Sequence, residues 1–164
     1  MIFKETKHNP DLYNTLLTLS RNIFFYKDLE FKDIYETRIY LMFFHYSIIL
    51  MISKIKGKRP DQNNYNSLFF YIENNLRELG FGDVSVNKRM KELNKVLYDI
   101  LLKINKSKID SFELSEMLIS KYFQDLTGIN NVKYQEFERY FKNFYDFCFE
   151  LSPDSMLREA INFK

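Results

Sequence analysis

The sequence predicts an all-α protein: one domain, residues 1–164, folded as a single compact bundle of about six helices around a central apolar helix. Three observations support this prediction. Apolar residues recur at spacings of three and four through several long segments, which is the period of a helix buried on one face. Only four glycines and three prolines interrupt the chain. No segment shows the strict alternation of a half-buried strand, and 164 residues suffice for one core.

The longest apolar segment predicts the central helix, at residues 33–56. It is apolar on nearly all sides after Arg38, so the other helices are expected to pack around it. Its uncharged run, residues 39–53, includes His45 and is shorter than the ~20 apolar residues of a membrane-spanning helix. We therefore interpret it as a buried helix, which ends before Pro60.

The other elements are predicted from their apolar stripes and from residues that favour helix ends. The third helix carries the stripe Tyr65, Leu68, Phe69, Ile72, Leu76, Leu79, and the fourth is expected to run antiparallel to it. In chain order the elements are a helix at 10–21 opened by Asn9 and Pro10, a short aromatic helix or turn at 23–26, the central helix, a third helix capped by Asp61, a fourth at 85–104, a fifth opened by Asp110 and Glu113 and ending near Asp125, a sixth at 133–151, and a short terminal helix or turn at 154–163.

The sixth helix has more aromatic residues than one buried face needs. Its expected buried residues are Phe137, Tyr140, Phe141, Phe144, Cys148 and Leu151. Tyr145, Phe147 and Phe149 point elsewhere, which favours further core packing or a homodimer interface. A groove for an apolar client protein is the alternative.

The composition argues against several function classes. A formal charge of +2 is too small for a dedicated nucleic-acid binder, and one cysteine excludes an internal disulfide. Two histidines and one cysteine lack metal-ligand spacing, and no phosphate-binding or nucleophile motif is present. We therefore expect a non-enzymatic protein without metal or cofactor. The first nine residues resemble neither a secretory signal nor a transit peptide, so the protein is expected to stay where it is made.

The segment 76–91 combines turn chemistry, charge and apolar spacing. Gly80 lies where a helix end requires a positive φ, and Phe81 is placed to fold back over the last turn. Gly82 follows, and Asp83 or Ser85 is expected to cap the next helix. Two carboxylates near one turn, Glu78 and Asp83, could serve acid–base chemistry, but capping and ion pairing are the simpler interpretation. We call residues 77–83 the motif turn.

Two polar residues of the central helix, Arg38 and His45, are expected to face the interior. Buried polar groups are normally hydrogen-bonded, so His45 is interpreted as a satisfied core histidine rather than a ligand. A sharper hypothesis joins both residues to Glu78 or Asp83 in one buried network. Such a network would fix the motif turn, including Arg77, against the central helix.

The start of the fourth helix is basic, with Lys88, Arg89, Lys91 and Lys95. Cations near a helix N-terminus are unfavourable with respect to the helix dipole. One interpretation is ordinary solvated charge. The other is a surface that binds an anionic partner, such as ribosomal RNA, acidic lipid headgroups or an acidic protein.

Several of these segments together resemble the ubiquinol–cytochrome c chaperone family. The segment 76–91 is similar to the family signature LRE-x-G-x-GD-x-x-V-x-K-[KR]-M-[KR], with Leu79 where Met is common and Asn87 where Pro is frequent. The flanking matches are Phe25-Tyr26 with Asp28, Arg38 followed seven residues later by His45, and Leu68-Phe69-Phe70. The resemblance covers roughly residues 10–125, with a weaker match to about 150.

The resemblance implies a non-catalytic assembly factor that binds newly made cytochrome b and assists maturation of ubiquinol–cytochrome c reductase. It further implies the ribosome or a small partner protein as additional partners, with contact at the membrane periphery. A bacterial member would act in the cytoplasm at the inner membrane, and an organellar one on the matrix side. The residues leave two rival classes open: a ribosome- or RNA-binding module that uses the basic face, and a small-molecule or cofactor carrier.

Overall fold

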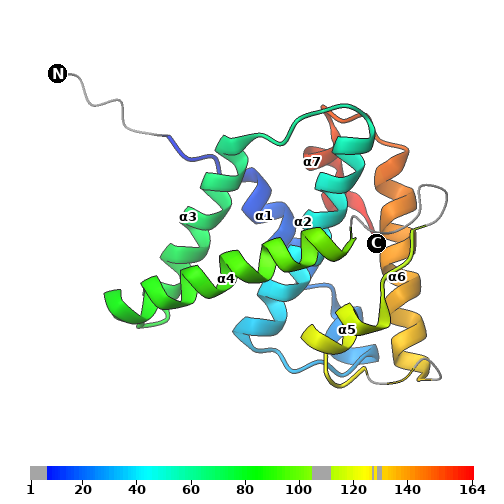
Figure 1. Ribbon diagram of the computed structural model, residues 1–164, viewed down its shortest axis with the longest axis horizontal. Coiled ribbons are helices and arrows are strands. Elements are labelled where there is room, and N and C mark those ends of the chain that lie inside the picture. Colours follow the sequence, from blue (N-terminus) through cyan, green and yellow to red (C-terminus); the bar gives the residue numbers. More distant parts are fainter. Residues whose placement is uncertain (1–6, 105–111, 127, 129–130) are drawn as a thin grey trace.

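The computed structural model describes residues 7–104, 112–126, 128 and 131–164. Within those residues the regular structure is entirely helical, as Figure 1 shows, and the all-α prediction is confirmed. In chain order the elements are α1 (Asp11–Ser20), the π-helix η1 (Phe24–Asp28), α2 (Tyr35–Ile55), α3 (Gln62–Glu78), α4 (Asp83–Ile104), α5 (Glu116–Tyr122), α6 (Val132–Phe149), α7 (Met156–Glu159) and the 3₁₀ helix η2 (Ala160–Asn162).

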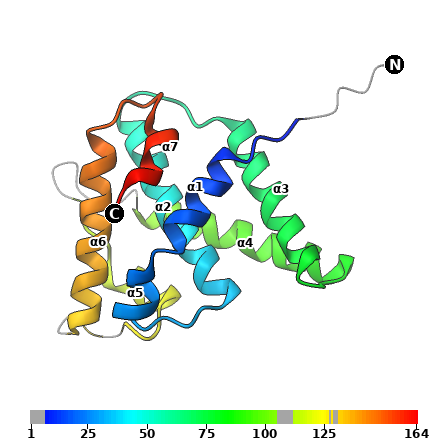
Figure 2. The same cartoon turned by 180° about the vertical axis from the view of Figure 1, so that it is seen from behind.

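Helix α2 lies at the centre of the bundle, in contact with α1, α4 and α6. Figure 1 shows α4 crossing in front of it, and Figure 2 shows α1 on the opposite side. Twelve of its 21 residues are buried, including the large side chains of Phe43 and Phe44. With a mean hydropathy of 1.3 it is long and apolar enough to cross a membrane, yet 72% of that window is buried by the rest of the chain. The prediction of a buried central helix is confirmed.

The helix ends follow local side-chain chemistry. The Asn9 carboxamide accepts a hydrogen bond from the Asp11 backbone N–H at 2.9 Å, and Asp61 accepts one from Asn63 N–H at 2.8 Å. Each satisfies a donor that the first helical turn leaves free. Helix α2 ends at Ile55, and Gly57 follows it with a φ of +80°. These predicted boundaries are correct to within two residues.

Two predictions about the helices are wrong. Helices α3 and α4 do not run antiparallel along their lengths; they diverge from the motif turn as a V (Figures 1 and 2) because α4 crosses over α2. The fifth helix covers only Glu116–Tyr122, and Ser115 caps it by accepting a hydrogen bond from Leu118 N–H at 3.1 Å. The predicted opening residue Asp110 lies outside the described residues.

Helix α6 buries the face that its spacing predicts, from Phe137 to Cys148. Two of the three additional aromatic rings, Tyr145 and Phe147, pack within the chain, whereas Phe149 is 38% exposed. Tyr145 stacks on Phe112 with centroids 4.9 Å apart, and Phe147 meets Phe163 of the C-terminal segment at 5.5 Å. This favours the core-packing interpretation of these aromatic residues, while a dimer through α6 stays a prediction.

Candidate partner-binding site

The motif turn closes α3 with two backbone hydrogen bonds. Gly80 N–H donates to the Arg77 carbonyl at 3.0 Å, and Phe81 N–H donates to the Leu76 carbonyl at 3.3 Å. This is the Schellman arrangement, and it requires the positive φ of +94° that Gly80 adopts. The predicted stop is confirmed. Leu79 is the exception in the predicted apolar stripe: it is 52% exposed, because it lies one residue beyond the helix end.

The next helix begins at Asp83, so that neither Asp83 nor Ser85 occupies the capping position in front of it. The first helical hydrogen bond runs from Val86 N–H to the Gly82 carbonyl at 2.9 Å. Asp83 instead pairs with Arg77 across the turn, and Arg77 also reaches Glu73 at 3.3 Å. The hydrogen bond that Arg77 donates to the Asp83 carboxylate raises the pKa of Arg77. The pair therefore joins the end of α3 to the start of α4.

Arg89 connects the motif turn to the central helix. Its guanidinium lies 3.4 Å from a Glu36 carboxylate oxygen in the first turn of α2. The same group lies over the Phe81 ring, 4.2 Å from its centroid, in a cation–π contact. The sequence-based interpretation grouped Arg89 with the outward lysines. No local signal identifies this role, since Glu36 is 53 residues away in the chain.

The predicted buried network between Arg38, His45 and the motif turn is wrong. Glu78 and Asp83 are both exposed, and the nearest acid to Arg38 is Asp33, at 3.6 Å. His45 also lies seven positions after Arg38, about 10 Å further along α2. They therefore meet different neighbours. Glu78 and Arg38 both act electrostatically on the Tyr13 hydroxyl, with opposite signs, but the pKa of Tyr13 is raised mainly by burial.

His45 is a satisfied core histidine, as its simpler interpretation held. One ring nitrogen, Nδ1, lies 2.6 Å from the Leu41 carbonyl and donates to it, and Nε2 accepts a hydrogen bond from the Tyr140 hydroxyl at 2.8 Å. The ring packs among aromatic side chains, with Phe144 centred 4.8 Å away. Burial lowers the pKa of His45 to about 4, so the imidazole is neutral at physiological pH.

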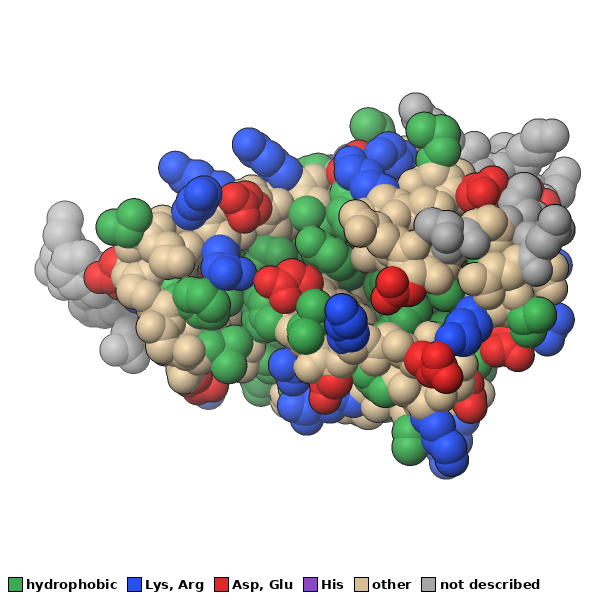
Figure 3. All heavy atoms as spheres, turned by 90° about the horizontal axis from the view of Figure 1, so that it is seen from below, with side chains coloured by type: hydrophobic (Ala, Val, Ile, Leu, Met, Phe, Trp, Pro, Cys, Tyr) green, Lys and Arg blue, Asp and Glu red, His purple; other side chains and the backbone are tan. Residues whose placement is uncertain are grey.

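The remaining basic residues of α4 face outward. Lys88, Lys91 and Lys95 are exposed, and none forms an ion pair with any residue that the structure describes. Seen from below, basic side chains stand out along one edge of the molecule (Figure 3). These three lysines are the basic face. The structure thus divides the predicted basic cluster into three free cations and the engaged Arg89.

The C-terminal part of α4 is tied to α5 instead. Burial alone would raise the pKa of Asp99, but hydrogen bonds from Lys121, Tyr122 and Lys103 hold that pKa well below its usual range. The distances from Asp99 to Lys121 and Lys103 are 2.8 and 2.9 Å. This carboxylate therefore carries a structural ion-pair cluster that fixes α5 on α4.

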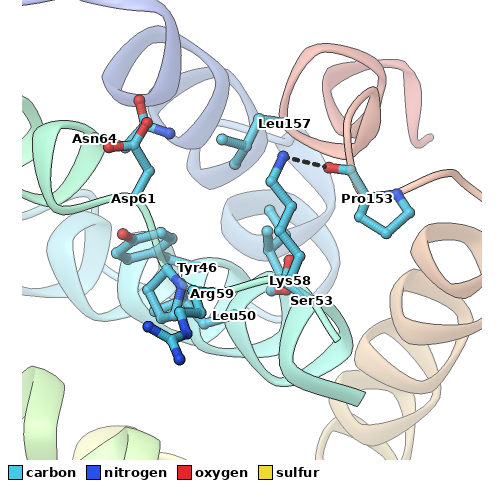
Figure 4. A pocket seen from close by; sticks show the side chains of 11 residues that line it. Tyr46, Leu50, Ser53, Lys58, Arg59, Asp61, Asn64, Pro153 and Leu157 are labelled. Carbon is cyan, nitrogen blue, oxygen red and sulfur yellow. Dashed lines mark hydrogen bonds between the residues drawn. The ribbon is translucent and has the colours of Figure 1, made fainter. Parts of the chain in front are cut away.

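A small cavity lies between the end of α2 and the C-terminal segment, with Tyr46, Ser53 and Lys58 in its wall (Figure 4). Lys58 spans it and donates to the Pro153 carbonyl at 3.3 Å. Its volume of about 60 Å³ is far below the roughly 300–1,000 Å³ of ligand pockets. Larger volumes, of about 330 and 420 Å³, are open surface grooves beside α5 and α7. Among the described residues, no group of three or more His, Cys, Asp or Glu is placed to hold a metal ion.

Comparison with known proteins matches the family model of the ubiquinol–cytochrome C chaperone to residues 27–142. The match spans α2, the motif turn and α4, and it continues into α6. No curated protein and no solved structure matches the chain. Because the family model covers well over half of the 164 residues, the chain belongs to the ubiquinol–cytochrome c chaperone family.

Proposed function

We propose that this protein is a non-catalytic assembly factor that binds newly synthesised cytochrome b and assists the assembly of ubiquinol–cytochrome c reductase. The observation that carries the proposal is the family match over residues 27–142, which contains the whole motif turn and the basic face. The construction of the motif turn agrees with a binding role. Arg77, Asp83 and Arg89 hold the start of α4 in place, while the lysines of the basic face form no ion pair with a described residue.

The proposal places the protein at the membrane where cytochrome b is inserted: the cytoplasmic side of the inner membrane in a bacterium, or the matrix side in an organelle. Partner contact is assigned to the basic face, because its three lysines are exposed and none pairs with an acid in the part of the chain that the structure describes. A site that meets a partner must keep such groups available. The ribosome and a small partner protein remain candidates for that contact beside the client itself.

Deletion of the gene tests the proposal. We expect loss of assembled ubiquinol–cytochrome c reductase and of haem-loaded cytochrome b, with cytochrome b messenger levels unchanged. Restoring the wild-type gene should recover both. Normal amounts of complex and of haem-loaded cytochrome b in the deletion strain would reject the function.

The exposed lysines also favour a second candidate, a ribosome- or RNA-binding accessory module. Binding of that kind falls steeply with salt because phosphate contacts release counterions. Purified ribosomes should then retain the wild-type protein at low salt and lose the Lys88→Glu, Lys91→Glu variant. Equal retention of both would exclude the basic face as a ribosome contact.

A further inference from the structure

The basic face is part of a longer surface stripe on α4. Six residues at alternating spacings of four and three share one side of the helix. The last lies 18 positions after the first, which is about five helical turns and about 27 Å along the helix. We call this the outer stripe; its members are Val84, Lys88, Lys91, Lys95, Tyr98 and Leu102.

The apolar members of the outer stripe are unusually exposed. Val84 is 85% exposed, Tyr98 62% and Leu102 63%. They lie at the two ends of the stripe, with the three lysines between them. Figure 3 shows hydrophobic and basic side chains projecting together from one edge of the molecule. The opposite side of α4 provides its core contacts, from Val86 to Ile104.

Among the residues that the structure describes, no ion pair balances the charge of the outer stripe. Of the acids on α4, Asp83 pairs with Arg77, and Asp99 is surrounded by Lys103, Lys121 and Tyr122. Glu92 lies beside the stripe, between Lys91 and the buried Leu93, as the one remaining acid of this helix. The stripe itself contains no acid, so it presents an excess of positive charge.

We infer that the outer stripe docks the protein on an anionic lipid bilayer, with α4 lying parallel to the membrane surface. The lysine ammonium groups would meet lipid phosphates while their alkyl stems, Val84, Tyr98 and Leu102 enter the headgroup region. The inference rests on the proposed function, whose partner-binding face it uses, and it names that partner as the bilayer.

A bilayer fits this stripe better than RNA does. Apolar side chains at both ends favour insertion among lipid headgroups. Protein surfaces that bind single-stranded nucleic acid are instead rich in arginine and in aromatic side chains on which bases stack. The single arginine of α4, Arg89, is turned away to Glu36 and Phe81. The charged groups of the stripe are therefore all lysines.

Vesicle co-sedimentation of the full chain tests the inference. We expect binding to vesicles of equal parts phosphatidylcholine and phosphatidylglycerol, and little binding to phosphatidylcholine alone. Removing one surface lysine weakens such binding about fivefold, so neutralising all three to Gln should weaken it by about a hundredfold. Charge reversal, with Lys88→Glu, Lys91→Glu and Lys95→Glu together, should abolish it.

A matched control keeps the same net charge. Lys27, Lys54 and Lys142 are exposed on η1, α2 and α6, and changing all three to Glu should leave vesicle binding within a few-fold of wild type. Circular dichroism of both triple variants checks that they are folded. Equal binding by the two variants would overturn the inference, as would equal binding of wild type to neutral and anionic vesicles.

A second variant separates lipid from nucleic acid. Val84→Ser with Leu102→Ser keeps every charge, and it should weaken vesicle binding at least fivefold while leaving retention by an RNA homopolymer unchanged. If the serine variant binds vesicles like wild type, the stripe is not inserted and the inference fails. A deletion strain that assembles the respiratory complex normally would reject the proposed function alone, since vesicle binding is measured on the purified protein.

Discussion

His45 is an ionisable residue buried without a charged partner. Its two hydrogen bonds, to Leu41 and Tyr140, are both compatible with the neutral ring. Protonation would put a positive charge among Phe25, Phe141 and Phe144, and no described carboxylate forms an ion pair with His45. The folded state therefore resists protonation that the unfolded chain accepts freely, and this difference couples stability to pH.

We predict that acidification destabilises the protein through His45. The pKa is lowered from 6.5 to about 4 on folding, so the unfolded chain binds the additional proton between these values. The stabilisation is complete above pH 6.5 and is lost as the pH falls towards 4, by about 3 kcal/mol at 1.36 kcal/mol per pH unit. Urea unfolding at several pH values measures it.

The His45→Gln variant provides the comparison, because carboxylates also titrate in this range and contribute equally to both proteins. Wild type should lose more stability than the variant between pH 6.5 and 4. Parallel pH profiles of the two proteins would show that His45 is not the cause.

Gly80 and Gly82 lie two positions apart in the motif turn and differ in how much they need to be glycine. A Cβ at either position would meet no atom within 4 Å, so space does not distinguish them. The backbone conformation distinguishes them, because Gly80 has a φ of +94° and Gly82 has no positive φ. We predict that Gly80→Ala lowers the free energy of unfolding by roughly 1 kcal/mol and that Gly82→Ala changes it much less. Chemical denaturation of both variants gives the answer; similar losses would contradict it.

At the scale of elements, local chemistry decided which predictions succeed. The stop at Gly80 and the cap at Asp61 depend on residues within a few positions, and the sequence predicts both. The contact of Arg89 with Glu36 and the pairing of His45 with Tyr140 cross 53 and 95 residues. A single sequence contains no signal for such pairs, because many residues could supply the same partner. The predicted network between Arg38, His45 and the motif turn is wrong for that reason.

The fifth helix illustrates the same limit in another way. Both Asp110 and Ser115 are suitable capping residues, and the sequence alone does not rank them. The structure shows Ser115 in that role, and α5 is consequently short. The contacts of Lys121 and Tyr122 with Asp99 of α4, rather than the cap, hold this short helix in its position.

Arg89 allows a prediction about how the elements are held together. Arg89→Ala removes both the Glu36 ion pair and the contact over Phe81, and we expect a loss of roughly 1 kcal/mol in the free energy of unfolding. Lys88→Ala, at the neighbouring exposed position, should stay within 0.5 kcal/mol of wild type by the usual range for surface substitutions. Thermal or urea unfolding distinguishes the two variants. An Arg89→Ala variant with the free energy of unfolding of the wild type would show that these contacts do not stabilise the fold.

For the whole molecule, Cys148 reports on global opening. The thiol is fully buried, and burial raises its pKa to about 12 against the opposing effect of the Lys56 charge. A protonated, inaccessible thiol reacts poorly. We predict that a thiol reagent labels the native protein very slowly and that the urea midpoint of labelling coincides with that of circular dichroism. Rapid labelling of the native protein would show that α6 opens locally.

The apolar character of α2 has a consequence for synthesis. The helix is complete at Ile55, but α6, which covers one of its sides, begins only at Val132. At about 5–20 residues per second, the ribosome needs roughly 4–15 s to make the intervening chain. During that interval a helix long and apolar enough to span a membrane lacks the cover that α6 provides. The chain therefore meets, in its own biogenesis, the hazard from which an assembly factor protects a membrane protein: an apolar helix made before its neighbours.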